Sequence, residues 1–319
     1  MDLRRIGWKF GISGRSGIFA CFDRILHGNS LVREWLDWDQ RCRDLVTSQH
    51  DGTQMSYHNE QDRPKSDHQI LQEQIDESLR EYQRNNRSLY LSSVAAGLEI
   101  GFSVFLIAAF YSHFSASVTP HVMYLLAAMS YPIGFMLVII GRSDLFTEHT
   151  TLAILPVLDG RKTVPQLLRV WGIIYGGNLI GAACFSALFV QFVGMTERFD
   201  SAVFAYYSEK MTADYFGGQF MGAIFAGWLM GLLAWMVTSS AETISRIVVV
   251  ALITFVIGLG GLPHCIAGAV AMFCAWFSEG TTVGFTEVVN FLVIATIGNT
   301  IGGSVFVGRV KYSFIGKNH

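Results

Sequence analysis

The sequence predicts an all-α polytopic membrane protein, with six transmembrane helices arranged as two inverted three-helix repeats. The second and the fifth helix are predicted to be broken. Three observations lead to this fold class. Charge is almost absent from long stretches, six apolar segments follow a polar leader, and one motif occurs twice in matching order.

Charge is concentrated at the start of the chain. Of the 319 residues, 51% are hydrophobic and 15% are charged, and residues 1–88 hold 13 of the 23 Lys and Arg and 14 of the 25 Asp and Glu. From Ser88 to Gly141 the only charged side chain is Glu99. A charge at the middle of a bilayer costs about 2.5–3.5 kcal/mol or more, so spanning segments exclude it. This pattern predicts membrane spans, and the net charge of −2 argues against nucleic acid as a partner.

The polar leader has two parts. Residues 1–66 show no sustained period, so we expect a mostly disordered segment with one amphipathic piece around residues 31–46. Residues 67–88 differ, because apolar side chains from Ile70 to Tyr82 recur at helical spacing among Gln, Glu and Arg. We expect an amphipathic cytoplasmic helix there. It is either a solvated leader or a helix that packs as a lid over a pore mouth.

Six apolar segments follow, at about residues 89–113, 121–141, 165–193, 214–238, 243–277 and 285–309. A spanning helix needs about 20 apolar residues. The fifth segment is too long for one plain span and is interrupted between Gly258 and Pro263. The second is followed by a polar insert and a second short apolar stretch, in "RSDLFTEHTTLAILPV". The six segments make a pore domain over residues 89–312, with a cytoplasmic tail over 313–319.

The loops predict the orientation. Lys and Arg gather in the loop at 159–169, at Arg246 and in the C-terminal tail, whereas the loops at 114–120 and 278–284 carry neither. Cytoplasmic loops are the ones enriched in Lys and Arg. Both termini are therefore predicted to be cytoplasmic, as an even number of spans requires.

The motif Gly-Asn-x-Ile-Gly occurs twice, with Asn178 and Asn299 lying 121 residues apart. The broken segments correspond as well, because Thr147 and His264 are 117 residues apart. Taken singly, each motif is typical of small residues at tight helix contacts. In matching order they indicate inverted repeats with one broken helix per half, which is the architecture of a transport pathway. We expect the two asparagines to bond the broken backbone across the two halves.

These residues resemble the formate/nitrite transporter family, within it the divergent YfdC-like branch. The resemblance rests on "DLFTEHTTLAILPV" at 144–157, "GNLIGA" at 177–182, "LPHCIAGAV" at 262–270 and "TIGNTIGG" at 296–303, and it covers about residues 89–312. It implies an aquaporin-like fold and a homopentamer with one pore per protomer in the inner (cytoplasmic) membrane. It also implies passage of small monovalent weak-acid anions such as formate, nitrite, hydrosulfide and short monocarboxylates.

The resemblance also implies roles for particular residues. Thr147 and His264 would lie on the substrate pathway, and Leu145 and Phe146 would belong to apolar constrictions. The chain departs from the family pattern in two places, since members often have a Lys before the fourth helix and an Asn inside it. The matching stretches read "EKMTADY", with Lys210 next to the expected position, and "AGWLMGL", with Gly227 or a neighbour in place of the Asn.

His264 follows Pro263 at the start of an expected half-helix. Free amides and the helix dipole favour an anion there, whereas an unpaired desolvated charge crosses apolar rings only at great cost. Histidine changes charge near neutral pH. We hypothesise that His264 stabilises or protonates the anion, and that Thr147 hydrogen-bonds the anion or His264. A channel and a proton-coupled symporter both stay open, and a purely structural histidine is the alternative.

Other polar residues lie near the predicted pathway. Glu99 interrupts the first apolar segment and is expected in a pore vestibule or in an inter-subunit hydrogen bond. Asp144, Glu148 and His149 flank the second break and are expected to be solvated vestibule positions.

The sequence contains no pattern that predicts a catalytic, cofactor or metal site. The stretch "GISGRSG" at 11–17 lacks the Gly-Lys-Ser/Thr of a phosphate-binding loop, and adjacent Glu148 and His149 are wrongly spaced for two metal ligands on one helical face. We therefore expect no enzyme, and expect the lipid bilayer, further copies of the chain, small anions and, for a symporter, protons as partners. Two alternatives remain. In the first, the same fold is a channel for another small solute, including a neutral one. In the second, the chain is a membrane-anchored interaction protein with a vestigial pore.

Overall fold

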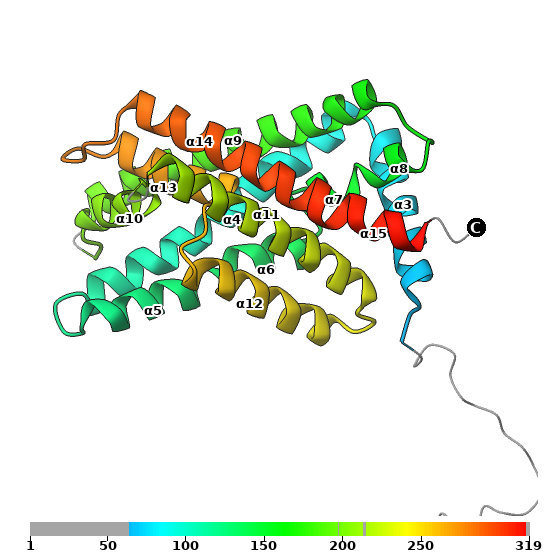
Figure 1. Ribbon diagram of the computed structural model, residues 1–319. Coiled ribbons are helices and arrows are strands. Elements are labelled where there is room, and N and C mark those ends of the chain that lie inside the picture. The colour runs from blue at the N-terminus through cyan, green and yellow to red at the C-terminus, as the bar shows by residue number, and fades with distance from the viewer. Residues whose placement is uncertain (1–63, 197, 213–214, 317–319) are drawn as a thin grey trace, which may run out of the picture. The chain divides into compact units, whose positions relative to one another are not determined.

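The computed structural model describes residues 64–196, 198–212 and 215–316. The chain divides into two compact units, Met1–Glu60 and Gln61–His319, and the first lies outside the described residues. The predictions for residues 1–66, including the amphipathic piece at 31–46, therefore fall almost wholly outside what the structure describes. The secondary structure of the described residues is helical, as predicted (Figure 1).

The helix α3 (Asp67–Gln83) begins at a capping box, in which Ser66 and Gln69 each bond the other's backbone amide through their side chains. It ends before residue 88, because Asn85 caps the next helix with its side chain. One face of α3 is buried in a cluster made of Ile70, Leu71, Ile75, Leu155, Trp235 and Ile315. Leu155, Trp235 and Ile315 belong to segments far apart in the chain. Because α3 contacts all three, it is a packing helix with a fixed place against the membrane region.

Two sets of helices, joined by α10 (Ala202–Thr212), make up the rest of the described chain. The first set is α4 (Asn86–Phe114), α5 (Pro120–Ser130), α6 (Pro132–Gly141), α7 (Phe146–Leu152), α8 (Leu155–Leu158) and α9 (Val164–Met195). The second set is α11 (Phe216–Ser239), α12 (Thr243–Leu259), α13 (Cys265–Phe277), α14 (Phe285–Ile301), the π-helix η2 (Gly302–Arg309) and α15 (Val310–Ile315).

Among the described residues, five helical stretches are long and apolar enough to cross a membrane, and α12 and α13 are shorter apolar helices. The five are Asn86–Phe114, Pro120–Gly141, Val164–Met195, Phe216–Ser239 and Phe285–Ile315. The expected fifth span, 243–277, is thus divided into two helices at the predicted glycine-rich break.

Each break has a local cause. Pro132 has no amide hydrogen and divides α5 from α6, while the Ser103 hydroxyl donates to the Tyr131 carbonyl at 2.6 Å. Arg142 ends α6 with a left-handed backbone, at φ 60°. In the second half Gly261 has φ 58°, a conformation that glycine adopts without steric cost.

The two halves use the same close contact between helices. In the first half α4 packs on α9, and a Cβ on Gly97 would lie 2.2 Å from the Asn178 carbonyl oxygen. In the second half α11 packs on α14, and a Cβ on Gly227 would lie 2.1 Å from the Asn299 carbonyl oxygen. Glycine at these positions lets the backbones approach closely. Gly227 therefore serves helix packing, and a pore-lining asparagine could not stand in its place.

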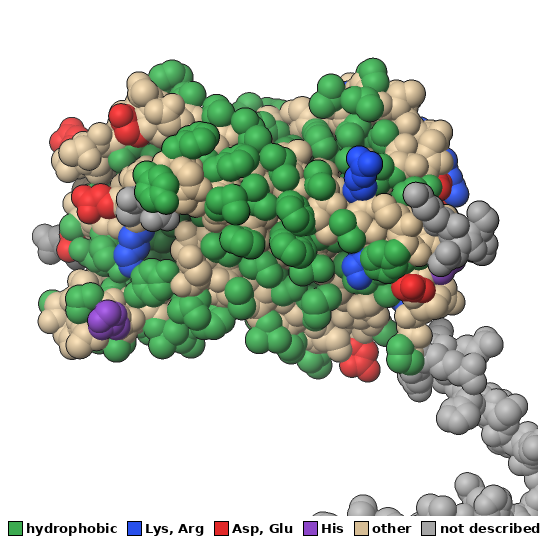
Figure 2. All heavy atoms as spheres, in the orientation of Figure 1, with side chains coloured by type: hydrophobic (Ala, Val, Ile, Leu, Met, Phe, Trp, Pro, Cys, Tyr) green, Lys and Arg blue, Asp and Glu red, His purple; other side chains and the backbone are tan. Residues whose placement is uncertain are grey.

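Apolar side chains cover the middle of the face shown in Figure 2, and charged side chains gather toward its two ends. Leu188 is 70% exposed and Leu252 is 61% exposed, and each lies inside an apolar helix. Exposed aliphatic side chains of this kind are what a lipid environment favours. The arrangement is that of a multi-pass membrane protein.

Candidate functional site

The half-helices α7 and α13 meet at their N-termini in the core of the molecule. The first amide of each is held by one asparagine: Phe146 N donates to Asn178 Oδ1, and Cys265 N donates to Asn299 Oδ1, both at 2.8 Å. Phe146 and Cys265 are 119 residues apart, so the symmetric partner of His264 is Leu145, the residue that precedes α7. The correspondence of Thr147 with His264 expected from the sequence is thus shifted by two residues.

Each asparagine also closes the break in its own half. Asn178 Nδ2 donates to the carbonyls of Ser93 and Asp144 at 2.8 Å. Asn299 Nδ2 donates to the carbonyls of Ala223 and Pro263 at 2.7 and 2.9 Å. The expectation that these side chains bond broken backbone is confirmed, but the bonds stay within a repeat and do not run across the two halves. The reason is that each motif helix packs directly on the first helix of its own repeat.

His264 joins the two halves. Its Nδ1 accepts a hydrogen bond from Ala267 N at 3.1 Å, which caps α13. Its Nε2 lies 2.8 Å from Thr147 Oγ1. Because Nδ1 accepts, the proton of the neutral ring belongs on Nε2, and this N–H donates to the Thr147 hydroxyl. The hydroxyl hydrogen of Thr147 is then left to donate to a further group.

Apolar side chains surround this pair. His264, Thr147 and Leu145 are fully buried, and the Phe135 ring meets the His264 ring edge-on, with centroids 5.0 Å apart. Phe146 packs against Tyr175 on α9, with ring centroids 4.9 Å apart. The two sequence-predicted pathway residues are thus in direct contact, with the two predicted constriction residues next to them in the chain.

A cavity of about 220 Å³ lies beside the break between α12 and α13. It is lined by Tyr124, Ala127, Ala128, Tyr131, Tyr207, Lys210, Met211, Ile257, Gly258, Gly260, Gly261 and Leu262. The Lys210 ammonium lies 4.4 Å from the Tyr124 ring centroid and 4.1 Å from that of Tyr206, so cation–π attraction holds it at the cavity. Burial lowers the pKa of Lys210.

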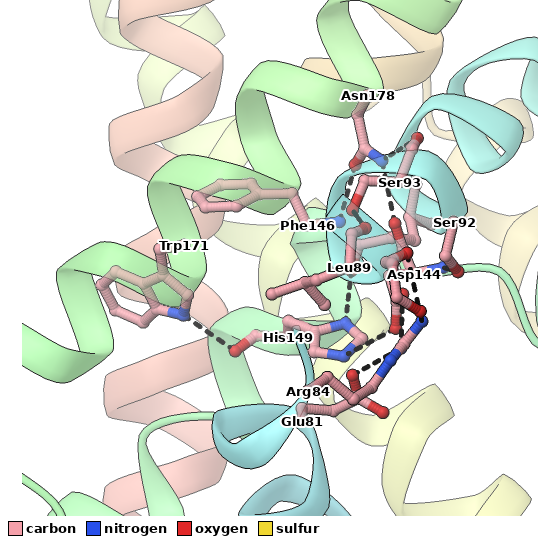
Figure 3. A network of polar contacts seen from close by, with 12 residues as sticks. Glu81, Arg84, Leu89, Ser92, Ser93, Asp144, Phe146, His149, Trp171 and Asn178 are labelled. Carbon is pink, nitrogen blue, oxygen red and sulfur yellow. Dashed lines mark hydrogen bonds and ion pairs between the residues drawn. The ribbon is translucent and has the colours of Figure 1, made fainter. Parts of the chain in front are cut away.

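A second cavity, of about 350 Å³, lies between α3, the loop that follows α6, and the end of α11. Figure 3 shows the polar network on its wall, which contains Glu81, Arg84, Asp144 and His149. Arg84 Nη1 lies 2.6 Å from Glu81 Oε2 and 2.8 Å from Asp144 Oδ2. Burial, and then the neighbouring Asp144, raise the pKa of Glu81.

The structure corrects the expectation for two of these residues. Asp144 and His149 were expected to be solvated, but they are 5% and 6% exposed because α3 covers them. Glu81 and Arg84 were not singled out in the sequence. Charged side chains such as these are common on the polar face of any amphipathic helix, so the sequence around them gave little indication of a special role.

Glu99 does not line either of these two cavities. Its side chain is partly buried on α4, and its Oε2 has no hydrogen-bond partner among the described residues. A place in a pore vestibule and an inter-subunit hydrogen bond both stay predictions for Glu99.

Two half-helices that meet N-terminus to N-terminus inside a bundle of apolar spans define the class of aquaporin-like membrane channels and transporters. A model of the formate/nitrite transporter family matches residues 68–313. The chain belongs to this family, which confirms the resemblance expected from its motifs.

Relatives and solved structures agree with this assignment. The inner membrane protein YfdC of Escherichia coli is 28% identical over 230 residues, which cover 72% of each chain. The nitrite transporter NirC of the same organism is 30% identical over 230 residues, covering 70% of this chain and 82% of NirC. An FNT family ion channel superposes with a TM-score of 0.70 at 22% identity, covering 77% of this chain and 98% of that one. A pentameric formate channel with formate bound superposes with a TM-score of 0.62 at 23% identity, covering 73% and 98%. The structural likenesses confirm the fold.

Proposed function

We propose that this protein is a transmembrane channel or transporter for small monovalent anions of weak acids, in the class of formate, nitrite, hydrosulfide and short monocarboxylates. The observation that carries the proposal is the Thr147–His264 hydrogen bond at the joined N-termini of α7 and α13. Family membership supports the same class, since the relatives include a nitrite transporter and a structural neighbour holds formate.

The hydrogen-bonded pair of Thr147 and His264, called here the polar pair, suits an anion for two reasons. The N-terminus of a helix carries partial positive charge, and two such ends converge here. The Thr147 hydroxyl accepts from His264, so its own hydrogen donates to a passing oxygen or sulfur atom. His264 then acts on the anion through Thr147, or directly when it carries a second proton.

The flanking residues complete the proposed pathway. Leu145 and Phe146 form an apolar constriction next to the polar pair, where an unpaired charge would be costly. Lys210 attracts anions into the cavity beside the break between α12 and α13. The other cavity, on the side of α3, is the opposite vestibule, and α3 serves as its lid, which is one of the two roles considered for this helix from the sequence.

The assembly is proposed by analogy with the pentameric structural neighbour. The protein forms a homopentamer in the inner (cytoplasmic) membrane, with one pathway in each protomer. The helices α12 and α13 together make the fifth of six spans in chain order, in addition to the five long helical stretches. Both termini are cytoplasmic, because the Lys- and Arg-rich loops lie on the side of α3 and the C-terminal tail.

The experiment that tests this proposal measures flux into proteoliposomes of the purified full-length chain. Formate, nitrite, hydrosulfide, acetate, lactate and a neutral control such as glycerol are compared at one acidic and one neutral pH. We expect anion flux that competing anions inhibit and that falls strongly in His264→Ala and His264→Phe. Flux of the neutral solute alone would contradict the proposal. Equal pH dependence in both variants and the unsubstituted chain would exclude a role for His264 in handling protons.

A further inference from the structure

Three ligand-type side chains that take no part in the Thr147–His264 pair lie together on the wall of the 350 Å³ cavity. Glu81 comes from the last turn of α3, Asp144 from the break after α6, and His149 from α7. One ligand atom from each of the three lies within 4.8 Å of the other two. Figure 3 shows the three side chains pointing toward one another.

The orientation of His149 leaves one ring nitrogen free to bind a cation. Its Nδ1 lies 3.0 Å from the Leu145 carbonyl oxygen, which can only accept, so Nδ1 carries a hydrogen. In the neutral ring Nε2 is then a bare lone pair, and it faces Asp144 Oδ1 at 3.6 Å. Two acceptors at this distance repel each other unless a positive charge lies between them. A backbone carbonyl that orients the far nitrogen is the usual outer partner of a metal-binding histidine.

Arg84 neutralises only part of the negative charge of the two carboxylates. Its guanidinium bonds Glu81 Oε2 and Asp144 Oδ2, and thereby orients both carboxylates while using one oxygen of each. One guanidinium against two carboxylates leaves a net charge of −1. This charge is mostly withdrawn from water, since Asp144 is 5% exposed and the Glu81 side chain is 17% exposed. A cation in contact with the remaining oxygens would be favourable.

We propose that Glu81, Asp144 and His149 bind a divalent transition-metal ion. An imidazole with two carboxylates suits Mn²⁺, Fe²⁺ and Zn²⁺. Zinc–ligand distances of about 2.0–2.2 Å require the three atoms to close in from their present separation, which small side-chain rotations supply. Water in the cavity completes the coordination. The bound ion ties α3 to both sides of the first helix break, so it fixes α3 at the vestibule.

The proposal is tested on the full-length protein in detergent, free of any histidine tag and stripped with a chelator. Co²⁺ is titrated and followed by its visible d–d absorption, Zn²⁺ is then used as the competitor, and bound metal is counted by mass spectrometry. We expect one ion per protomer. His149→Gln and Glu81→Gln are each expected to weaken Co²⁺ binding at least tenfold. His121→Gln, which changes an exposed histidine in the first turn of α5, is expected to bind as the unsubstituted protein does.

Two results would overturn the proposal. One is the absence of Co²⁺ and Zn²⁺ binding near neutral pH, which would leave a proton on His149 as the charge between the two acceptors. The other is binding that neither His149→Gln nor Glu81→Gln weakens. Size-exclusion chromatography and thermal melting check that each variant is folded. The Glu81 side chain is 17% exposed and that of His149 is 7% exposed, so the less buried Glu81→Gln keeps the proposal testable if His149→Gln does not fold. The readout is metal binding and not flux, so it stands apart from the proposed transport.

Discussion

At the scale of single residues, the Thr147 hydroxyl is one of the groups that connect the two halves of the molecule. Thr147 Oγ1 lies 2.8 Å from His264 Nε2, and both residues are fully buried. A buried N–H that loses its acceptor costs about 1–3 kcal/mol, because no water replaces the lost bond. The hydrogen bond therefore stabilises the fold, in addition to its proposed role in binding the anion.

Thr147→Val tests this hydrogen bond while keeping the shape of the side chain. The substitution leaves the His264 Nε2–H unpaired and removes the donor that faces the anion. We expect anion flux to fall about tenfold or more, since about 1.4 kcal/mol corresponds to a factor of ten. Proteoliposome flux and a thermal melt are the measurements. Thr254→Val is the matched control, because the buried Thr254 hydroxyl bonds the backbone of its own helix at 2.6 Å. Equal flux in the two variants would contradict the role of Thr147.

Lys210 gives a pH prediction at the same scale. Burial lowers its pKa, so its charge is lost at a lower pH than that of a free lysine. Weak-acid anions with acidic pKa values stay ionised throughout this range, so the change in attraction comes from the protein. We expect formate flux at low ionic strength to decline as the pH rises from neutral toward about 10.

Lys210→Arg is the control for that decline. The guanidinium keeps its charge over the whole range, so flux through the variant should stay nearly constant with pH. High salt should reduce the difference between the two proteins, because it screens the attraction. A decline of equal steepness in Lys210→Arg would show that another group titrates.

At the scale of helices, glycines set how closely the long helices approach. A Cβ on Gly181 would lie 2.1 Å from the Val94 carbonyl oxygen of α4, whereas a Cβ on Gly176 would meet nothing within 4 Å. Both glycines lie in the same helix, α9. Helix propensity alone favours alanine over glycine by up to about 1 kcal/mol at either position.

Gly181→Ala and Gly176→Ala therefore form a matched pair. We expect Gly181→Ala to force α4 and α9 apart and to lower the thermal midpoint markedly, with loss of the folded oligomer as the extreme outcome. Gly176→Ala should leave the midpoint unchanged or raise it slightly. Thermal melts followed by size-exclusion chromatography in detergent check both. Similar midpoints for the two variants would refute the close α4–α9 contact.

At the scale of the whole molecule, the proposed assembly predicts a mass. Five copies of the 35.4 kDa chain give about 177 kDa of protein, after subtraction of bound detergent. Light scattering coupled to size-exclusion chromatography measures it. A chain that lacks residues 1–63 should still assemble as five copies, with a mass lower by the deleted residues, and should keep its anion flux, because the family match begins only at residue 68. Loss of flux with the oligomer intact would instead show that the leader takes part in transport.

The sequence by itself determined the fold class, the family and the polar pair. Three local patterns carried this information: the charge-free segments, the repeated Gly-Asn-x-Ile-Gly motif and the two break sequences. Each of them corresponds to a local feature of the structure. The sequence predicted that Asn178 and Asn299 bond backbone, because an amide offers both donors and an acceptor where helices are interrupted. The family resemblance of its motifs led to the expectation that Thr147 and His264 lie on one pathway.

Only the tertiary structure decided which residues of distant segments meet. It placed the asparagine bonds within each repeat, buried Asp144 and His149 under α3, and brought Glu81 and Arg84 to them across 60 residues or more. It also showed that Gly227 packs against the backbone of α14. These facts depend on how whole helices dock, and docking is set by shape and burial summed over many contacts. Composition and spacing along the chain do not carry that information.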